Sequence, residues 1–152
     1  MIYLLDTDTT IMMMRGLSIT NPKSEKQRER REIGQRIFRA CKRQAMKGDV
    51  IGLSAITISE LEYGACRADA PDDERARMQR VLSPFVRFDY KATEPPRHYG
   101  EVRSTLESKG QGIGPNDLLI AAHALSLSAV LVSNNMKEFS RIRGLACENW
   151  TR

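Results

Sequence analysis

The sequence predicts an α/β fold, a three-layer α/β/α sandwich around a central, mostly parallel sheet. Short continuous apolar runs, such as residues 2–5 and 129–132, are typical of strands that are buried on both faces. Longer segments with helical periodicity alternate with these runs. The 152 residues are 41% hydrophobic and contain no repeat, low-complexity tract or linker, so a single domain over 1–152 is expected.

The first half of the chain is expected to contain two strands and three helices. Their predicted ranges are 2–5, 7–17, 25–46, 50–54 and a helix from Thr57 or Ser59 to about Cys66. Ser24 follows a break around Pro22 and can cap the long helix. Apolar residues recur at every fourth position of that helix, at Ile33, Ile37, Cys41 and Ala45.

The second half continues the alternation of helices and strands. Its predicted elements are a helix over about 74–82, a strand around 86–90, helices over about 95–109 and 116–127, and strands over 129–132 and 147–150. Asp72 or Asp73 is expected to cap the first of these helices, and Asn116 or Asp117 to begin the third. The proline pair Pro95-Pro96 marks the start of the second.

Bulk features exclude several classes of protein. The apolar runs are too short to span a bilayer, and no signal peptide precedes the first strand, so cytoplasmic residence is expected. The three cysteines lie far apart and form no Cys-x-x-Cys pair, which argues against disulfides and structural zinc. With only two histidines, the chain has few of the side chains that usually bind zinc.

The positive charge is concentrated in one element. The net charge is +5, but residues 23–47 carry ten Lys and Arg against three Glu, a local charge of +7 that leaves −2 for the rest. The arginines of interest there are Arg28, Arg31, Arg36, Arg39 and Arg43. Such a segment suits a phosphate backbone or an acidic protein partner, and an ordinary solvated helix face is the third interpretation.

Three acidic residues are the candidate site. Asp6, Glu60 and Asp117 are expected at junctions between strands and helices, and the carboxyl ends of parallel strands meet at one sheet edge. Clustered carboxylates repel one another, and a divalent cation relieves that repulsion. Each also has a plain interpretation: a helix cap for Asp6, a favourable dipole position for Asp117 and a solvated surface residue for Glu60. For the neighbouring Asp8, helix capping is favoured.

In order and spacing, four stretches of the chain and its tail resemble PIN-domain ribonucleases, and within them the VapC-type toxins of toxin–antitoxin pairs. The stretches are Leu4–Asp8, Ser54–Gly64, Ile113–Ala124 and Leu131–Asn135, with Glu138-Phe139, Gly144-Leu145 and Glu148–Trp150 in the tail. The resemblance covers nearly the whole chain. It implies a PIN-like fold and a metal-dependent endoribonuclease.

The resemblance also assigns roles to residues. Asp6 and Asp117 become ligands of Mg²⁺, with Mn²⁺ as the alternative ion, and Glu60 completes the acidic triad. Many PIN domains have a fourth acid where this chain has the neutral Asn135, so a one-ion or substrate-completed site is plausible. Glu138 and Ser133 are auxiliary candidates, the first as a substitute acid and the second to orient water or substrate.

The implied partners are an RNA substrate, a cognate VapB-like antitoxin and a second copy of the chain in a homodimer. The segment 21–47 looks expanded relative to the usual toxin. In the family this region borders the active-site groove and receives the antitoxin, so its arginines are candidates for RNA or antitoxin contact.

Two alternatives have other chemistry. The run Asp6-Thr7-Asp8-Thr9-Thr10 fits the signature of haloacid-dehalogenase-like phosphatases, but Ser133-Asn134-Asn135 stands where that family has an acidic pair. A non-catalytic RNA-binding module is the second alternative. The intact set of Asp6, Glu60 and Asp117 argues against it.

Overall fold

A five-stranded parallel sheet forms the centre of the computed structural model, which describes residues 1–152. The strand order is β3-β2-β1-β4-β5, and every pair of neighbours runs parallel. The strands are β1 (Ile2–Leu5), β2 (Val50–Ser54), β3 (Val86–Phe88), β4 (Val130–Val132) and β5 (Cys147–Glu148). The predicted parallel sheet is therefore confirmed.

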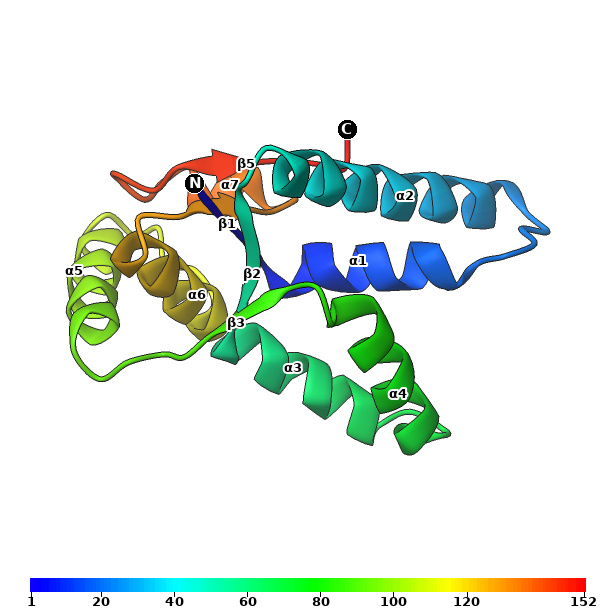
Figure 1. Cartoon of the computed structure of the whole chain (residues 1–152). Coiled ribbons are helices and arrows are strands. Elements are labelled where there is room, and N and C mark those ends of the chain that lie inside the picture. The colour runs from blue at the N-terminus through cyan, green and yellow to red at the C-terminus, as the bar shows by residue number, and fades with distance from the viewer.

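Helices cover both faces of the sheet, so the predicted three-layer sandwich is confirmed (Figure 1). They are α1 (Thr7–Ser18), α2 (Glu25–Met46), α3 (Ala55–Cys66), α4 (Pro71–Leu82), α5 (Glu94–Ser108), α6 (Pro115–Ser126) and α7 (Met136–Phe139). Tyr3 and Leu5 of β1 face a core built with α1–α4, whereas Leu4 faces a second core built with α5–α7. No helix combines the length and the apolar character of a membrane span.

Helices α1 and α2 form a tightly packed hairpin, which lies at the right of Figure 1. At its crossing point two glycines meet, because a Cβ atom built on Gly16 would lie 2.7 Å from the Cα atom of Gly34. A side chain at either position would force the two backbones apart. The hairpin therefore depends on this glycine pair.

Helix starts are where the sequence prediction was least accurate. Helix α3 begins at Ala55 rather than at Thr57 or Ser59, because the hydroxyl of Ser54 caps it by accepting the Ile56 backbone N–H at 3.1 Å. Helix α4 begins at Pro71, before the predicted caps Asp72 and Asp73, since proline suits the first turn of a helix.

In helices α2 and α6, the structure confirms one prediction from the sequence and corrects two others. Ser24 caps α2 as predicted, accepting the Gln27 N–H at 3.2 Å. Ala45, however, is exposed near the end of α2 rather than buried. Helix α6 begins at Pro115, one or two residues before the predicted start at Asn116 or Asp117, and no side chain caps it. The three cysteines are free, as predicted.

Candidate active site

Asp6 links the end of β1 to the start of α1 and is only 3% exposed. Its Oδ1 atom accepts the backbone N–H of Thr9 at 2.8 Å and so caps α1, while its Oδ2 atom accepts the hydroxyl of Ser133. Burial raises the pKa of Asp6, and the hydrogen bonds from Ser133 and Thr9 oppose that shift. Asp6 is thus both a cap and a buried acid, and the predicted capping role of Asp8 is wrong.

Glu60 reaches the site from the second turn of α3, not from the junction between strand and helix that the sequence suggested. The hydroxyl of Thr7 donates to its Oε2 atom, and the Nδ2 atom of Asn116 donates to its Oε1 atom at 2.8 Å. The carboxylate is therefore held between α1 and α6. Neither Thr7 nor Asn116 was predicted as a site residue, although each stands next to one of the candidate aspartates.

Asp117 is the third residue of α6 and is half-buried. Burial and then the negative charges of Asp6, Glu138, Asp8 and Glu60 raise its pKa to about 6. The loop before α6 follows helix α5, so Asp117 does not follow a strand as expected. Three elements nevertheless bring the predicted acids to one end of the sheet, and Asp8 and Glu138 add their charges.

A polar cavity of about 240 Å³ lies beside Asp8, Glu60 and Asp117 of this cluster. It has no hydrophobic lining and is bounded by Thr7, Asp8, Glu60, Gly114, Pro115, Asn116 and Asp117. The cavity offers carboxylate, hydroxyl and amide oxygens to a polar ligand. Its composition suits a charged group such as a hydrated cation or a phosphate bound through one.

Ser133, Asn135 and Glu138 form a chain of hydrogen bonds behind Asp6. The backbone N–H of Asn135 donates to Ser133 Oγ at 2.9 Å, and Asn135 Nδ2 donates to Glu138 Oε2 at 2.8 Å. Ser133 in turn donates to Asp6. All three predicted auxiliary residues therefore lie at the site, with Ser133 as the direct neighbour of Asp6.

The acidic cluster suits a divalent cation by its chemistry. Hard cations such as Mg²⁺ and Mn²⁺ prefer oxygen ligands, and such an ion relieves the repulsion among these carboxylates, which adds to burial in raising the pKa of Asp117. No three Asp, Glu, His or Cys side chains converge closely enough to enclose an ion as they stand. Among the carboxylates, Asp6 is the strongest electrostatic neighbour of Asp117.

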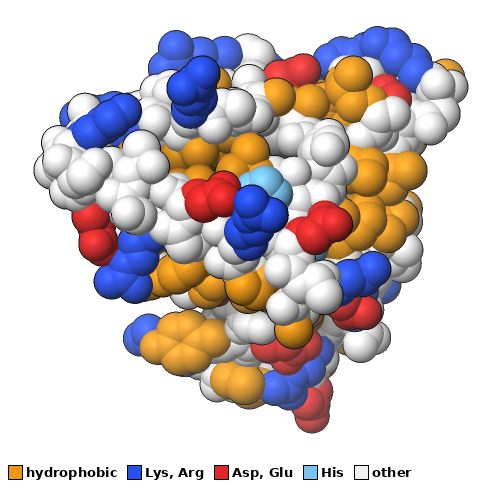
Figure 2. Space-filling view, turned by 90° about the vertical axis from the view of Figure 1, so that its left-hand side faces the viewer, with side chains coloured by type: hydrophobic (Ala, Val, Ile, Leu, Met, Phe, Trp, Pro, Cys, Tyr) orange, Lys and Arg blue, Asp and Glu red, His pale blue; other side chains and the backbone are white.

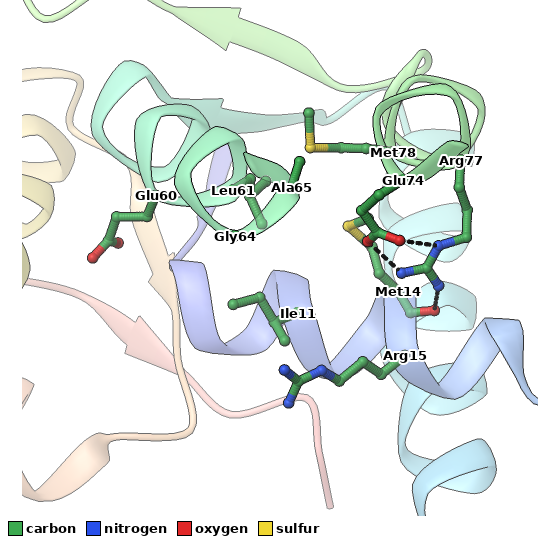
Figure 3. A pocket seen from close by; sticks show the side chains of 10 residues that line it. All are labelled: Ile11, Met14, Arg15, Glu60, Leu61, Gly64, Ala65, Glu74, Arg77 and Met78. Atoms are coloured by element: carbon green, nitrogen blue, oxygen red, sulfur yellow. Dashed lines mark hydrogen bonds and ion pairs between the residues drawn. The ribbon is translucent and has the colours of Figure 1, made fainter. Parts of the chain in front are cut away.

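A second cavity, of about 120 Å³, lies between α1, α3 and α4 (Figure 3). Ile11, Met14, Leu61, Ala65 and Met78 supply its apolar wall. Arg77 closes one side, where it pairs with Glu74 at 2.6 Å and donates to the Met14 carbonyl at 3.3 Å. Glu60 stands at the opposite end with its carboxylate turned away from the apolar side chains, so this groove leads to the acidic site (Figure 3).

The basic residues of α2 have different environments. Arg28 pairs with Glu25 at 2.8 Å, and Arg36 donates to the Thr151 carbonyl at 2.6 Å, which ties α2 to the C-terminal segment. Arg39 and Arg43 are exposed, while Arg31 is partly buried. On the face beside α5, by contrast, Lys and Arg side chains alternate with Asp and Glu (Figure 2). The positive charge of the chain is therefore local to α2.

A parallel sheet with acidic residues gathered at one end defines a class of protein, and this chain belongs to the PIN-domain family. The family model, described as PIN domain, matches residues 23–145. Among relatives, the chain is 42% identical to ribonuclease VapC2 of Rickettsia felis over 70% of this chain and 78% of that one. It is 35% identical to the tRNA(fMet)-specific endonuclease VapC of Salmonella typhimurium over 97% of each.

The structural comparison agrees. The crystal structure of VapBC2 from Rickettsia felis bound to a DNA fragment from the promoter matches with a TM-score of 0.82 and 35% identity, over 99% of each chain. The PIN-like expectation from sequence is confirmed. The phosphatase alternative is set aside with it, because the chain matches the PIN-domain family and a VapC endonuclease over nearly its whole length.

Proposed function

We propose that this protein is an endoribonuclease that acts as the toxin of a VapBC-type toxin–antitoxin pair. The observation that carries the proposal is the placement of the half-buried Asp117 carboxyl among Asp6, Glu138, Asp8 and Glu60, where burial and then their charges raise its pKa to about 6. Relatives named as VapC ribonucleases, matched over nearly their full length, support the same activity. The reaction would be hydrolysis of an RNA phosphodiester.

The proposed cofactor is Mg²⁺, with Mn²⁺ as the alternative, held by Asp6 and Asp117. When bound, such an ion activates water and stabilises the charge that develops on the phosphate. Ser133 fixes the orientation of the Asp6 carboxylate, and Thr7 and Asn116 fix that of Glu60. Glu60 then faces the polar cavity, where it can orient the attacking water and accept its proton.

The proposed RNA contact is the solvent-facing side of α2. Arg28, Arg39 and Arg43 are exposed there, and the guanidinium group suits paired hydrogen bonds to phosphate oxygens. Arg31 contributes charge from the edge of this face. Arg36 donates a hydrogen bond to the Thr151 carbonyl and so holds the helix in place beside the C-terminal segment.

The proposed protein partner is a VapB-like antitoxin that occupies the groove between α1, α3 and α4. This groove has an apolar wall, carries Arg15, Glu74 and Arg77 at its rim and ends at Glu60. A segment lying in it would reach the acidic cavity and block access to Asp117. Structural neighbours that are VapBC complexes support such a partner. A homodimer and a cytoplasmic location stay predictions from the sequence.

The experiment that tests the function is cleavage of a pool of small RNAs by the purified, antitoxin-free protein. The wild type and Asp117→Asn are each incubated with Mg²⁺, with Mn²⁺ and with EDTA. We expect discrete fragments that require both the metal and Asp117. Equal cleavage by Asp117→Asn, or no cleavage by a folded wild-type protein with either metal, would overturn the proposal.

A further inference from the structure

His123 is a buried polar residue that the proposed chemistry does not use. It lies on α6 and is 1% exposed, and its Nδ1 atom is 2.8 Å from the hydroxyl oxygen of Ser54. Ser54 is fully buried and is both the last residue of β2 and the cap of α3. The pair therefore joins α6 to the start of α3.

Ser54 also accepts the backbone N–H of Ile56 through its Oγ atom. A hydroxyl has one proton and two acceptor sites, so Ser54 can either donate to Nδ1 of a neutral His123 or accept a proton from that atom, and the two arrangements correspond to the two imidazole tautomers. Burial lowers the pKa of His123, and the hydrogen bond to the Asp89 backbone and the charge of Asp89 oppose the shift.

The surroundings hold the ring in one orientation. Phe88 and Tyr90, on either side of Asp89, pack edge-on against it with centroids at 6.5 and 5.3 Å. The charged groups that line the cavity beside the ring are Arg87, Asp89, Lys91 and Glu94. Two aromatic contacts and the hydrogen bond with Ser54 limit the orientations of the imidazole, which is the property that a positioning residue needs.

The two helices that Ser54 and His123 join are those that carry the site. Glu60 lies on α3, and Asn116 and Asp117 begin α6. The helices are linked a second time at the surface, where Asn116 Nδ2 donates to Glu60 Oε1 at 2.8 Å. One link is exposed to solvent and to substrate, whereas the Ser54–His123 link is buried and protected from both.

We propose that His123 is a positioning residue for the active site, acting through Ser54 to fix α3 against α6 and so to set Glu60 opposite Asp117. The inference rests on the proposed ribonuclease function. A shift of about 1 Å between catalytic groups can cost on the order of a hundredfold in rate. A buried hydrogen bond between the two carrier helices is therefore a determinant of kcat.

The test uses a matched pair of variants. In His123→Asn the side-chain amide takes the place of Nδ1 and can donate to or accept from Ser54, whereas His123→Gln places its amide near the Nε2 position and leaves Ser54 without this partner. We expect kcat to fall about tenfold or more in His123→Gln with KM changed less than about twofold, and to stay within about threefold of wild type in His123→Asn. Ile120→Val, a buried change on the same helix, should leave kcat unchanged.

A second readout does not depend on activity. Amide hydrogen exchange of residues 55–60 should accelerate in His123→Gln but not in His123→Asn or Ile120→Val. Equal kcat in the two His123 variants, a comparable fall of kcat in Ile120→Val, or unchanged exchange in α3 would overturn the positioning role. If the wild type does not cleave RNA, the function proposal fails, and the exchange measurement still decides whether His123 fixes α3.

Discussion

At the residue scale, the carboxylates of the site lie close enough to repel one another. Asp117 is half-buried and surrounded by four further carboxylates, and its raised pKa shows that the folded, metal-free protein opposes its ionisation. The sequence predicted Asp6, Glu60 and Asp117 together because of their spacing relative to apolar runs. It could not predict Thr7 or Asn116 as partners of Glu60, because those contacts depend on how α1, α3 and α6 pack.

Replacing Asp117 by Asn should stabilise the metal-free protein while abolishing cleavage. The folded pKa of about 6 lies above the unfolded value of 3.8, so the group destabilises the fold progressively as the pH rises from about 4 to 6, and fully above that. The cost at neutral pH is roughly 2–3 kcal/mol. Thermal unfolding at pH 7.5 in EDTA should therefore give a higher Tm for Asp117→Asn. At pH 4 the difference should nearly vanish, and a lower Tm at both pH values would contradict the prediction.

Cleavage should decline as the pH falls below about 6. A protonated Asp117 binds a cation poorly, and its pKa of about 6 in the metal-free protein sets the range in which protons and metal compete. Raising the Mg²⁺ concentration should move the acidic limb of the rate profile to lower pH. A limb that does not move with Mg²⁺ would assign it to another group.

At the element scale, the strands and the long helix could be predicted closely, whereas helix starts could not. Residues 50–54 and 25–46 match β2 and α2, because continuous apolar runs and four-residue periodicity are properties of the chain itself. The start of α3 depends on Ser54, whose cap is reinforced by His123 from a distant helix. Asp117 was grouped with residues at junctions between strands and helices, although the helix predicted over about 95–109, which is α5 in the structure, precedes it.

Gly16→Ala should destabilise the protein, and Gly100→Ala should not. The new methyl group at Gly16 would meet the backbone of α2, while a Cβ atom at Gly100 in α5 has no neighbour within 4 Å. In an open helical position alanine is favoured over glycine by about 1 kcal/mol. Urea unfolding should show a loss of stability for the first variant and a small gain for the second. Equal effects would mean that α1 and α2 can separate at no cost.

At the scale of the whole molecule, charge and shape are distributed unevenly. The positive charge lies on α2, the apolar groove lies between α1, α3 and α4, and the acidic cavity lies at the end of that groove. Each surface suits a different partner: RNA phosphates, an antitoxin segment and a divalent cation. The charge imbalance was visible in the sequence, but the groove was not, because α3 and α4 form it together with α1, from which α2 and β2 separate them in the chain.

RNA binding should weaken with salt, and Arg39→Gln combined with Arg43→Gln should reduce that dependence. For single-stranded RNA, each arginine that no longer neutralises a phosphate should lower the slope of log K against log salt by about 0.7. The control replaces Arg97 and Arg103 on α5, which already pair with Glu101 and Glu107. Filter binding with an inactive Asp117→Asn background measures both. Equal slopes for both pairs would place the RNA elsewhere.

Gly64→Trp should prevent antitoxin binding without loss of ribonuclease activity. Gly64 lines the groove, is exposed and has open space where a side chain would extend. Gly100→Trp is the control, an exposed glycine in a helix outside the groove. Co-purification with the antitoxin and RNA cleavage should separate the two variants. Antitoxin retained by Gly64→Trp would place its binding surface outside this groove.

The glycine contact between α1 and α2 also has a mechanical consequence. Asp6 and Gly16 lie at opposite ends of α1, about 15 Å apart at the rise of an α-helix. Because the Gly16 backbone packs directly against α2, the basic helix has a fixed position relative to α1, whose N-terminal residues line the acidic cavity. RNA bound along α2 would then reach the active site at a fixed distance from the bound segment. The cleavage position should therefore be set by the distance along the RNA from that segment, and a longer spacer in the RNA should shift the cut by the same number of nucleotides.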